Sequence, residues 1–123
     1  LSIIAERPVF GSGAGTYALA LSEKIPNRPN WFYQPVHNIF ALIASEIGLA
    51  GLLLFLAALA AFLMHIYRKR KNDSGALMIA VIAAVFVIAL FDHWLYSLHF
   101  GLICSGALIG LLANASDADT LTE

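Results

Sequence analysis

The residues whose chemistry stands out are His37 and Asn38, which lie where a polar segment meets a long apolar run. An imidazole can accept or donate a proton near neutral pH. If a helix begins near Pro35, the positive end of its dipole disfavours an imidazolium, so His37 should be a neutral base. The same helix end attracts anions such as phosphate. These features suit transfer of a group from a phosphate to a hydroxyl. A histidine that simply keeps its polar tip in water is the open alternative.

Two carboxylates lie within or beside apolar runs. Glu46 is the only ionisable residue between positions 39 and 64, and a carboxylate inside a bilayer is costly enough to suggest a function. Because Glu46 is nine residues from His37, it points away from His37 on a helix. We therefore expect it to make a helix–helix hydrogen bond or to be protonated in a structural role. Asp92 precedes His93, and this pair could orient a base, bind a cation or cap a turn.

The four histidines, at positions 37, 65, 93 and 99, raise the question of a metal site. The sequence contains no HExxH motif or paired-histidine spacing, and His65 lies at the opposite end of the apolar run. The single cysteine, Cys104, cannot build a cysteine-based site within this chain. If a helix continues past residue 92, Asp92, Tyr96 and His99 share one face. We predict neither a metal nor a cofactor.

The elements that must position these residues follow from the composition. Of the 123 residues, 60% are hydrophobic and 12% are charged, whereas soluble domains are about 25% charged. The apolar residues form long runs, so we predict an all-α integral membrane protein, a polytopic helical bundle with three spanning segments. The predicted segments are a spanning helix at 37–67, a cytoplasmic basic loop at 68–75, a helical hairpin at 76–113 that turns near 92–99, and a polar, disordered tail at 114–123. The last arm of the hairpin, 97–113, could instead be re-entrant.

Charge fixes the expected orientation. Four consecutive cations occupy positions 68–71, and positive residues in short loops stay on the cytoplasmic side. Residues 1–36 should therefore form an extracytoplasmic loop. This loop contains a glycine-rich turn, with Gly11, Gly13 and Gly15 at alternate positions. Such a turn can form a nest of backbone N–H groups that binds an anion, or it can be a plain tight turn.

Small residues follow His37 along the predicted helix. On a continuous helix, His37, Ala44, Gly48, Gly51 and Phe55 lie close to one line. Small residues allow another helix to approach closely in lipid. We therefore predict that Gly48 and Gly51 pack against a neighbouring helix.

Three stretches resemble a known family. The spacing of His37-Asn38, nine residues, Gly48, two residues and Gly51 resembles the motif of the bacterial O-antigen ligase superfamily, which also holds O-antigen polymerases and protein O-oligosaccharyltransferases. Residues 6–17, with Arg-Pro-x-x-Gly-x-Gly-x-Gly, look like the stretch that opens the family's large periplasmic loop. Residues 91–96, Phe-Asp-His-Trp-Leu-Tyr, are similar to an Asp-His-aromatic element in the last helices of many members.

The resemblance implies an enzyme of the bacterial inner membrane that assembles cell-surface polysaccharide such as lipopolysaccharide. It implies a metal-independent glycan transfer at the periplasmic face, from undecaprenyl diphosphate to an acceptor hydroxyl. His37 matches the catalytic histidine, expected to activate or position that hydroxyl. Arg7 matches an arginine that holds the diphosphate, and Arg28 is added from its place in the same loop. The residues expected to support the site are Asn38, Glu46, Asp92 and His93.

The expected partners are the bilayer, the lipid-linked glycan donor and an acceptor that is a lipid, a glycan or a protein. We expect no nucleic-acid partner. We also expect this chain to be the C-terminal piece of a longer protein, inactive alone and completed by upstream helices. The alternative is a fragment of an ion-coupled transporter or channel in which Glu46 and Asp92 line an ion path. A helical bundle that only anchors partners is a third interpretation.

Overall fold

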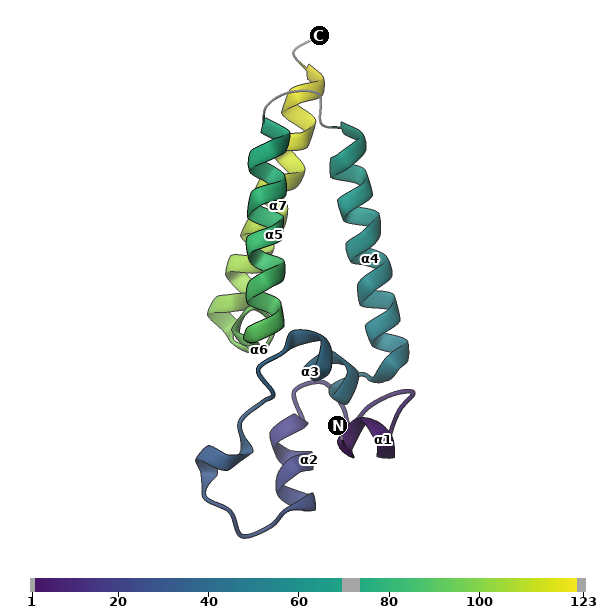
Figure 1. Cartoon of the computed structure of the whole chain (residues 1–123), viewed down its shortest axis with the longest axis vertical. Coiled ribbons are helices and arrows are strands. Elements are labelled where there is room, and N and C mark those ends of the chain that lie inside the picture. Colours follow the sequence, from purple (N-terminus) through teal and green to yellow (C-terminus); the bar gives the residue numbers. More distant parts are fainter. Residues whose placement is uncertain (1, 70–73, 122–123) are drawn as a thin grey trace.

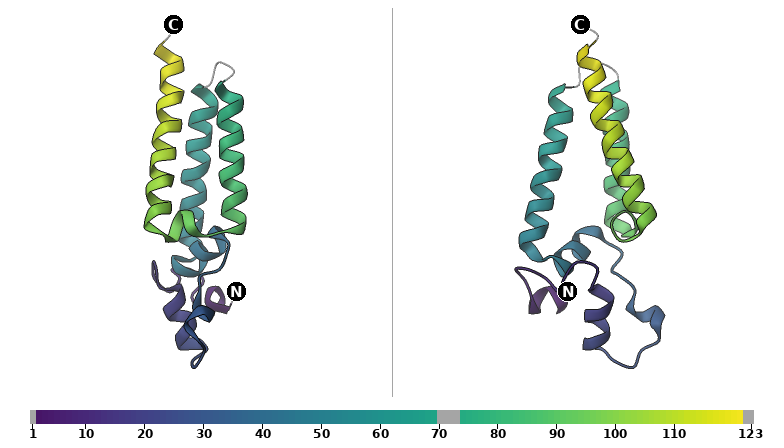
Figure 2. Two further views of the ribbon diagram at one scale, coloured as in Figure 1. Left: turned by 90° about the vertical axis from the view of Figure 1, so that its left-hand side faces the viewer. Right: turned by 180° about the vertical axis from the view of Figure 1, so that it is seen from behind.

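The computed structural model describes residues 2–69 and 74–121, and every element in these two ranges is a helix. Three long helices, α4 (Gly48–Lys69), α5 (Ser74–Phe91) and α7 (His99–Leu121), rise from one cluster of short elements (Figure 1). The short elements are α1 (Ser2–Glu6), α2 (Tyr17–Lys24), η1 (Asn30–Tyr33), α3 (Ile39–Glu46) and α6 (Trp94–Ser97). Figure 2 shows α3 at the foot of the long helices, between them and α2.

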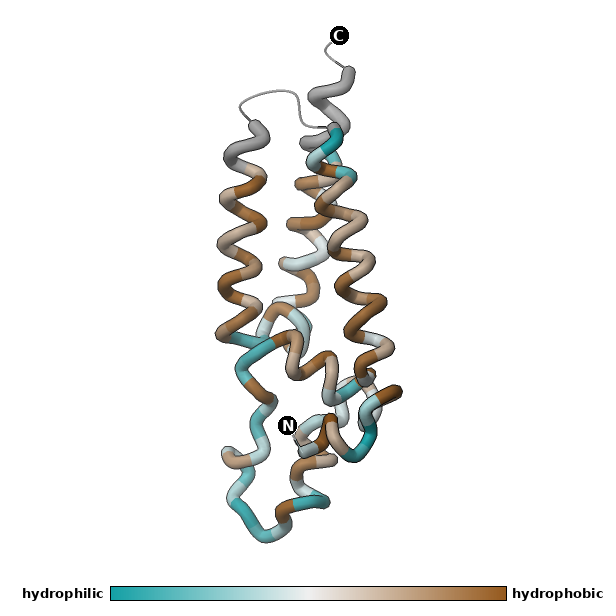
Figure 3. Tube along the Cα trace, turned by 45° about the vertical axis from the view of Figure 1, so that its right-hand side comes forward, coloured by the Kyte–Doolittle hydropathy of each residue, from teal (hydrophilic) through white to brown (hydrophobic). Residues whose placement is uncertain are grey.

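Within the described residues, one helix is long and apolar enough to cross a membrane. It covers Gly48–Arg68, with 21 residues and a mean hydropathy of 2.4. Two shorter apolar helices, Met78–Phe91 and His99–Asn114, follow it. In Figure 3 the hydrophobic colour runs along the long helices, while hydrophilic residues gather in the loops below. The all-helical prediction is confirmed with one candidate span, and the second and third spans stay predictions.

Two small clusters of buried side chains hold the described helices together. At the foot of the long helices, Ile39 and Ile43 of α3 pack with Ala89 of α5. Towards the other end, the long helices share a second cluster of buried residues, which are Ile66, Met78 and Leu112. Elsewhere the long helices expose large apolar side chains, a surface that is stable in lipid or against further apolar helices. The described helices are therefore joined at two places, where α3 meets the end of α5 and near the opposite end of the long helices.

The predicted continuous helix at 37–67 is wrong in one respect, because it consists of two helices. The first, α3, ends at Glu46, and α4 begins at Gly48, whose φ is +74°. The Leu49 N–H donates to the carbonyl of Pro8 (2.8 Å), and the Ala50 N–H donates to that of Val9 (3.3 Å). The preceding loop thus supplies partners for the first N–H groups of α4, which a continuous helix would have used internally.

This break removes the predicted common stripe of His37, Gly48 and Gly51. It also gives Gly48 a different role from helix packing, because a Cβ at Gly48 would lie 2.1 Å from the carbonyl oxygen of Val9. Only glycine fits both the left-handed φ and this contact with the loop backbone. At Gly51 the nearest atoms to an added Cβ belong to the side chain of Ile47, one turn earlier in the chain.

The predicted helix start, turn and tail also differ in detail. Helix α3 starts at Ile39 rather than near Pro35, because Asn38 caps it. The segment that joins α5 to α7 contains α6. It lies in the stretch near 92–99 where the hairpin was predicted to turn. Helix α7 continues to Leu121, so the tail predicted to be disordered is helical as far as that residue. Of the predicted basic loop, residues 70–73 lie outside the described residues, and the orientation stays a prediction.

Candidate functional site

The glycine-rich loop wraps the C-terminal end of α3. Gly11, Gly13 and Gly15 all have positive φ, at 68°, 119° and 72°. The Ser12 N–H donates to the carbonyl of Ser45 (2.9 Å), and the Gly13 N–H donates to that of Glu46 (2.8 Å). A Cβ at Gly11 would lie 2.4 Å from the Glu46 carbonyl carbon, so the loop can approach this closely only through glycine. The loop therefore satisfies the last carbonyls of α3.

The same loop also binds an anion, and that anion is the carboxyl group of Glu46. Its Oε2 accepts the Gly15 N–H (2.9 Å), and its Oε1 accepts the Tyr17 N–H (3.2 Å). A third donor is the hydroxyl of Tyr96 in α6, 3.1 Å from Oε2. Glu46 is only 4% exposed, and a buried carboxyl group needs such partners. The expected bond from Glu46 to another helix is present, and it ties the loop, α3 and α6 together.

The surroundings of Tyr96 change the pKa of its phenol. Burial, followed by the charge of Glu46 and the hydrogen bond to it, raises the pKa of Tyr96 to about 12 from its ordinary value of 10.0. The phenol therefore remains a hydrogen-bond donor to Glu46 across the physiological pH range.

Asn38 ties the start of α3 to the end of α5. Its Oδ1 accepts the N–H of Ala41 (2.9 Å), as an N-cap side chain does. Its Nδ2 donates to the carbonyl of Leu90 (3.0 Å), in the last turn of α5. One amide side chain thus satisfies groups at two helix ends. It also places His37, the preceding residue, beside the segment that follows α5.

In that segment, Asp92 and His93 form a turn rather than a continued helix. Asp92 Oδ1 accepts the N–H groups of His93 (2.6 Å), which is the N-cap residue of α6, and of Trp94 (3.3 Å), its first residue. Asp92, Tyr96 and His99 were expected to share one face only if a helix continued past residue 92, and this condition is not met, because α5 ends at Phe91 and the backbone is extended at Leu98. The hydroxyl of Tyr96 donates to the carboxyl group of Glu46 instead.

This turn brings His93 to His37. The two imidazole rings have centroids 5.2 Å apart and are inclined by 42°. One ligand atom from each of His37, Asp92 and His93 lies within 4.8 Å of the other two. His37 is exposed, while the other two are half-buried. We call these three residues the His–Asp–His cluster.

The two arginines proposed for diphosphate binding lie elsewhere. Arg7 is exposed and precedes Pro8, which contacts the start of α4, so α3 separates Arg7 from His37. The eight residues of α3 span about 12 Å. The Arg28 guanidinium lies 5.5 Å from the ring centroid of Phe32. The loop that carries Arg28, between α2 and η1, is the part of the chain farthest from the long helices in Figure 1.

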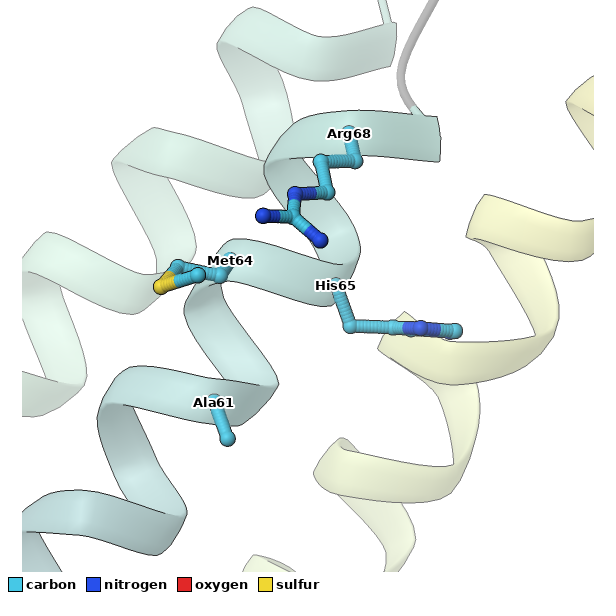
Figure 4. A pocket seen from close by; sticks show the side chains of 4 residues that line it. All are labelled: Ala61, Met64, His65 and Arg68. Carbon is cyan, nitrogen blue, oxygen red and sulfur yellow. The ribbon is translucent and has the colours of Figure 1, made fainter.

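A separate cavity of about 480 Å³ lies towards the opposite end of α4. It is lined by Ala61, Met64, His65 and Arg68, and Figure 4 shows His65 directed towards the neighbouring helix. Because its lining residues lie some four to five helical turns after Gly48, this cavity is about 25 Å from the foot of the helices. His65 is therefore not part of the His–Asp–His cluster.

A family model described as O-Antigen ligase matches residues 1–56. Residues 1–56 are therefore similar to the O-antigen ligase family. The matched segment contains α1 to α3 and the first residues of α4, and so includes His37 and the loop around Glu46. Neither the search of curated proteins nor that of solved structures found a match for the chain. O-antigen ligases are membrane proteins, a property with which the apolar α4 agrees, and the family suggests ligase-like or polymerase-like glycan transfer.

The roles of Tyr96 and Ser97, which lie outside the matched segment, were not predicted from the sequence. The hydroxyl of Tyr96 donates to Glu46, which lies 50 positions earlier in the chain, and no local sequence pattern predicts such a contact. Ser97 lies four residues after His93 and bonds its Nδ1 at 2.6 Å. The spacing of four was visible in the sequence, but its meaning depended on α6 being a helical turn.

Proposed function

We propose that this chain is part of a membrane glycosyltransferase that moves a glycan from undecaprenyl diphosphate to an acceptor hydroxyl. The observation that carries the proposal is the position of His37, exposed at the start of α3 within the O-antigen ligase segment and next to His93. An exposed imidazole held beside a rigid helix end can meet a substrate, whereas a buried one cannot.

In the proposed reaction, His37 acts as the general base. Its neutral ring takes the proton of the acceptor hydroxyl as that oxygen forms a bond to the anomeric carbon of the glycan. The bond from this carbon to the diphosphate oxygen breaks, and its electron pair leaves with undecaprenyl diphosphate. General-base catalysis of this kind contributes roughly 10²- to 10⁴-fold in rate.

Arg7 and Arg28 are the arginines proposed for the diphosphate, since a guanidinium binds phosphate oxygens with two parallel hydrogen bonds. In the described structure, however, α3 separates Arg7 from His37 and Arg28 lies in the loop farthest from the long helices, so the two arginines do not form one site with His37 there. Because the two arginines lie in separate parts of the outer loop, we propose that upstream helices of the same protein complete the donor site. The acceptor would be a lipid, a glycan or a protein. The site would face the periplasm of the bacterial inner membrane, with residues 1–37 on that side.

In the transporter alternative, the carboxylates of Glu46 and Asp92 would line a path and bind the ions that pass along it. The carboxyl group of Glu46 is buried and already accepts hydrogen bonds from the loop and from Tyr96. Asp92 uses one carboxylate oxygen to accept the N–H groups of His93 and Trp94 at the start of α6. Structural roles of this kind favour the glycosyltransferase over the transporter.

The two functions are separated by comparing three variants of the full-length protein in lipid vesicles. His37→Ala should reduce glycan transfer at least about 100-fold, while His65→Ala, at the far end of α4, should leave it unchanged. Ion flux should be absent in all preparations, Glu46→Gln included. Undiminished transfer by His37→Ala, or an ion flux abolished by Glu46→Gln, would overturn the proposal.

A further inference from the structure

The His–Asp–His cluster has the chemistry of a metal site. Two imidazoles and one carboxylate are a donor set that suits zinc and neighbouring divalent transition metals. The three residues offer ligand atoms within 4.8 Å of one another, although they come from two segments far apart in the chain. Sequence spacing predicted no metal because His37 and His93 become neighbours only when α3 docks against the end of α5.

We propose that His37, Asp92 and His93 bind one divalent transition-metal ion such as Zn²⁺, and that this ion reversibly blocks His37. The ion is an inhibitor of the site and not a participant in the reaction. Metal binding stands on the geometry alone, whereas the inhibition rests on the proposed function.

His93 is prepared for metal binding by Ser97. When the Ser97 hydroxyl donates to the carbonyl of His93 (3.1 Å), its oxygen can accept from Nδ1 of the same residue (2.6 Å). Neutral His93 then carries its proton on Nδ1, and the lone pair lies on Nε2. Metal-bound histidines characteristically donate their other ring N–H in this way, which fixes both tautomer and ring orientation.

Asp92 and His37 are also anchored close to the end of α5. The Asp92 N–H donates to the carbonyl of Ile88 (2.8 Å), and Oδ1 of Asp92 accepts the N–H groups of His93 and Trp94. Among the hydrogen bonds of the described residues, Oδ2 of Asp92 has no partner and remains available to a ligand. The backbone at His37 is held near the same helix end, because the side chain of the next residue, Asn38, donates to the carbonyl of Leu90 in the last turn of α5.

The geometry requires a modest adjustment. Ligand atoms about 2.0–2.2 Å from a tetrahedral zinc ion lie about 3.4 Å apart. The widest spacing in the cluster, at most 4.8 Å, must therefore shorten by up to about 1.4 Å. His37 is exposed and lies outside the helix, so rotation of its side chain can close this distance. The fourth position would be filled by water.

Inhibition follows from the lone pair of the imidazole. A ring nitrogen that is bonded to a metal cannot also accept the proton of a hydroxyl. Metal binding and the base role of His37 therefore exclude each other, and a chelator should restore the base.

Metal binding is tested on the purified full-length protein in nanodiscs, by calorimetric titration with Zn²⁺ and by the visible absorption of added Co²⁺. The wild-type protein should bind an equivalent that His93→Ala loses or binds at least about tenfold more weakly. Ser97→Ala keeps all three ligands and should weaken binding about 10- to 100-fold. His65→Ala is the matched control and should bind as the wild type does. Equal binding by wild type and His93→Ala, with thermal unfolding showing that both are folded, would overturn the metal site.

Inhibition is tested in the transfer assay. Zn²⁺ should suppress glycan transfer by the wild type, EDTA should restore it, and Ser97→Ala should require about 10- to 100-fold more Zn²⁺ for the same suppression. Zn²⁺ that binds at the cluster but leaves transfer unchanged would overturn the inhibitory role. If the metal-free wild type transfers no glycan, the proposed function fails, while the binding titration still decides the metal site.

Discussion

The imidazole rings of His37 and His93 lie 5.2 Å apart between centroids, although 55 residues separate them in the chain. Two contacts near the rings produce this proximity. Asn38 bonds to the carbonyl of Leu90, and Tyr96 bonds to the carboxyl group of Glu46. The first contact joins α3 to α5 and the second joins α3 to α6. The position of the candidate base therefore depends on residues outside the matched O-antigen ligase segment.

Asn38 performs two tasks that two substitutions can separate. Asn38→Asp keeps the oxygen that caps α3 but removes the donor to Leu90. We expect near-normal stability of the cap but a transfer rate lowered roughly 10- to 100-fold, because His37 loses its placement beside His93. Asn38→Ala should lose the placement and an additional ~1 kcal/mol of unfolding free energy. Transfer rates and unfolding in detergent would be measured together. Two variants with the same stability and rate would contradict the division of roles.

Gly48 should not tolerate a side chain. Alanine there meets the carbonyl of Val9 and must adopt a left-handed φ, which alone costs about 1–2 kcal/mol. We expect Gly48→Ala to lower the unfolding free energy by more than about 2 kcal/mol. Gly110→Ala in α7 is the matched control, because apart from the neighbouring residues and backbone of its own helix no heavy atom lies within 4 Å of its added Cβ. The prediction fails if both substitutions change the unfolding free energy by the same small amount.

Glu46→Gln should be more damaging than Tyr96→Phe. Three donors face the Glu46 carboxyl group, and a glutamine offers one oxygen to them while turning an NH₂ towards the rest. We expect a loss of about 2–3 kcal/mol of unfolding free energy for Glu46→Gln and about 1 kcal/mol for Tyr96→Phe. Denaturant titration of both variants measures the two losses. A larger loss for Tyr96→Phe would show that the loop donors contribute little.

The raised pKa of Tyr96 makes its contribution dependent on pH. A group whose pKa is higher in the folded protein stabilises the fold fully below its unfolded pKa, here about 10, and loses that effect as pH rises through the folded value of about 12. The stability difference between wild type and Tyr96→Phe should therefore be constant up to about pH 10 and shrink between pH 10 and 12. Thermal unfolding of both proteins across this range measures it. A difference that vanishes already near pH 8 would contradict the bond to Glu46.

Local chemistry made several features predictable. The apolar runs predicted membrane helices because their apolar stretches are longer than those of helices in soluble proteins. His37 was chosen as the candidate base because its imidazole lies at the border between polar and apolar sequence, and that role stays a prediction. The hydrogen bond of Glu46 to another helix followed from the cost of an unpaired carboxyl group in an apolar run.

Features that depend on distant contacts could not be predicted. The break at Gly48 exists because the Pro8–Val9 backbone lies against α4, and glycine in an apolar run is equally compatible with helix packing. Tyr96 and Ser97 gained roles only once the turn after α5 was folded. The His–Asp–His cluster was not predicted for the same reason. A motif with fixed spacing along the sequence cannot reveal that residue 37 and residues 92–93 become neighbours in the fold.

The role of His37 as base is tested most directly by measuring two quantities on the same His37→Ala preparation: kcat for glycan transfer and the Kd for the undecaprenyl diphosphate-linked donor. We predict that kcat falls at least about 100-fold, because proton transfer from the acceptor is lost. The donor Kd should stay within about threefold of the wild type, because His37 is not proposed to hold the diphosphate. A wild-type kcat, or a loss that lies entirely in the donor Kd, would contradict the assignment.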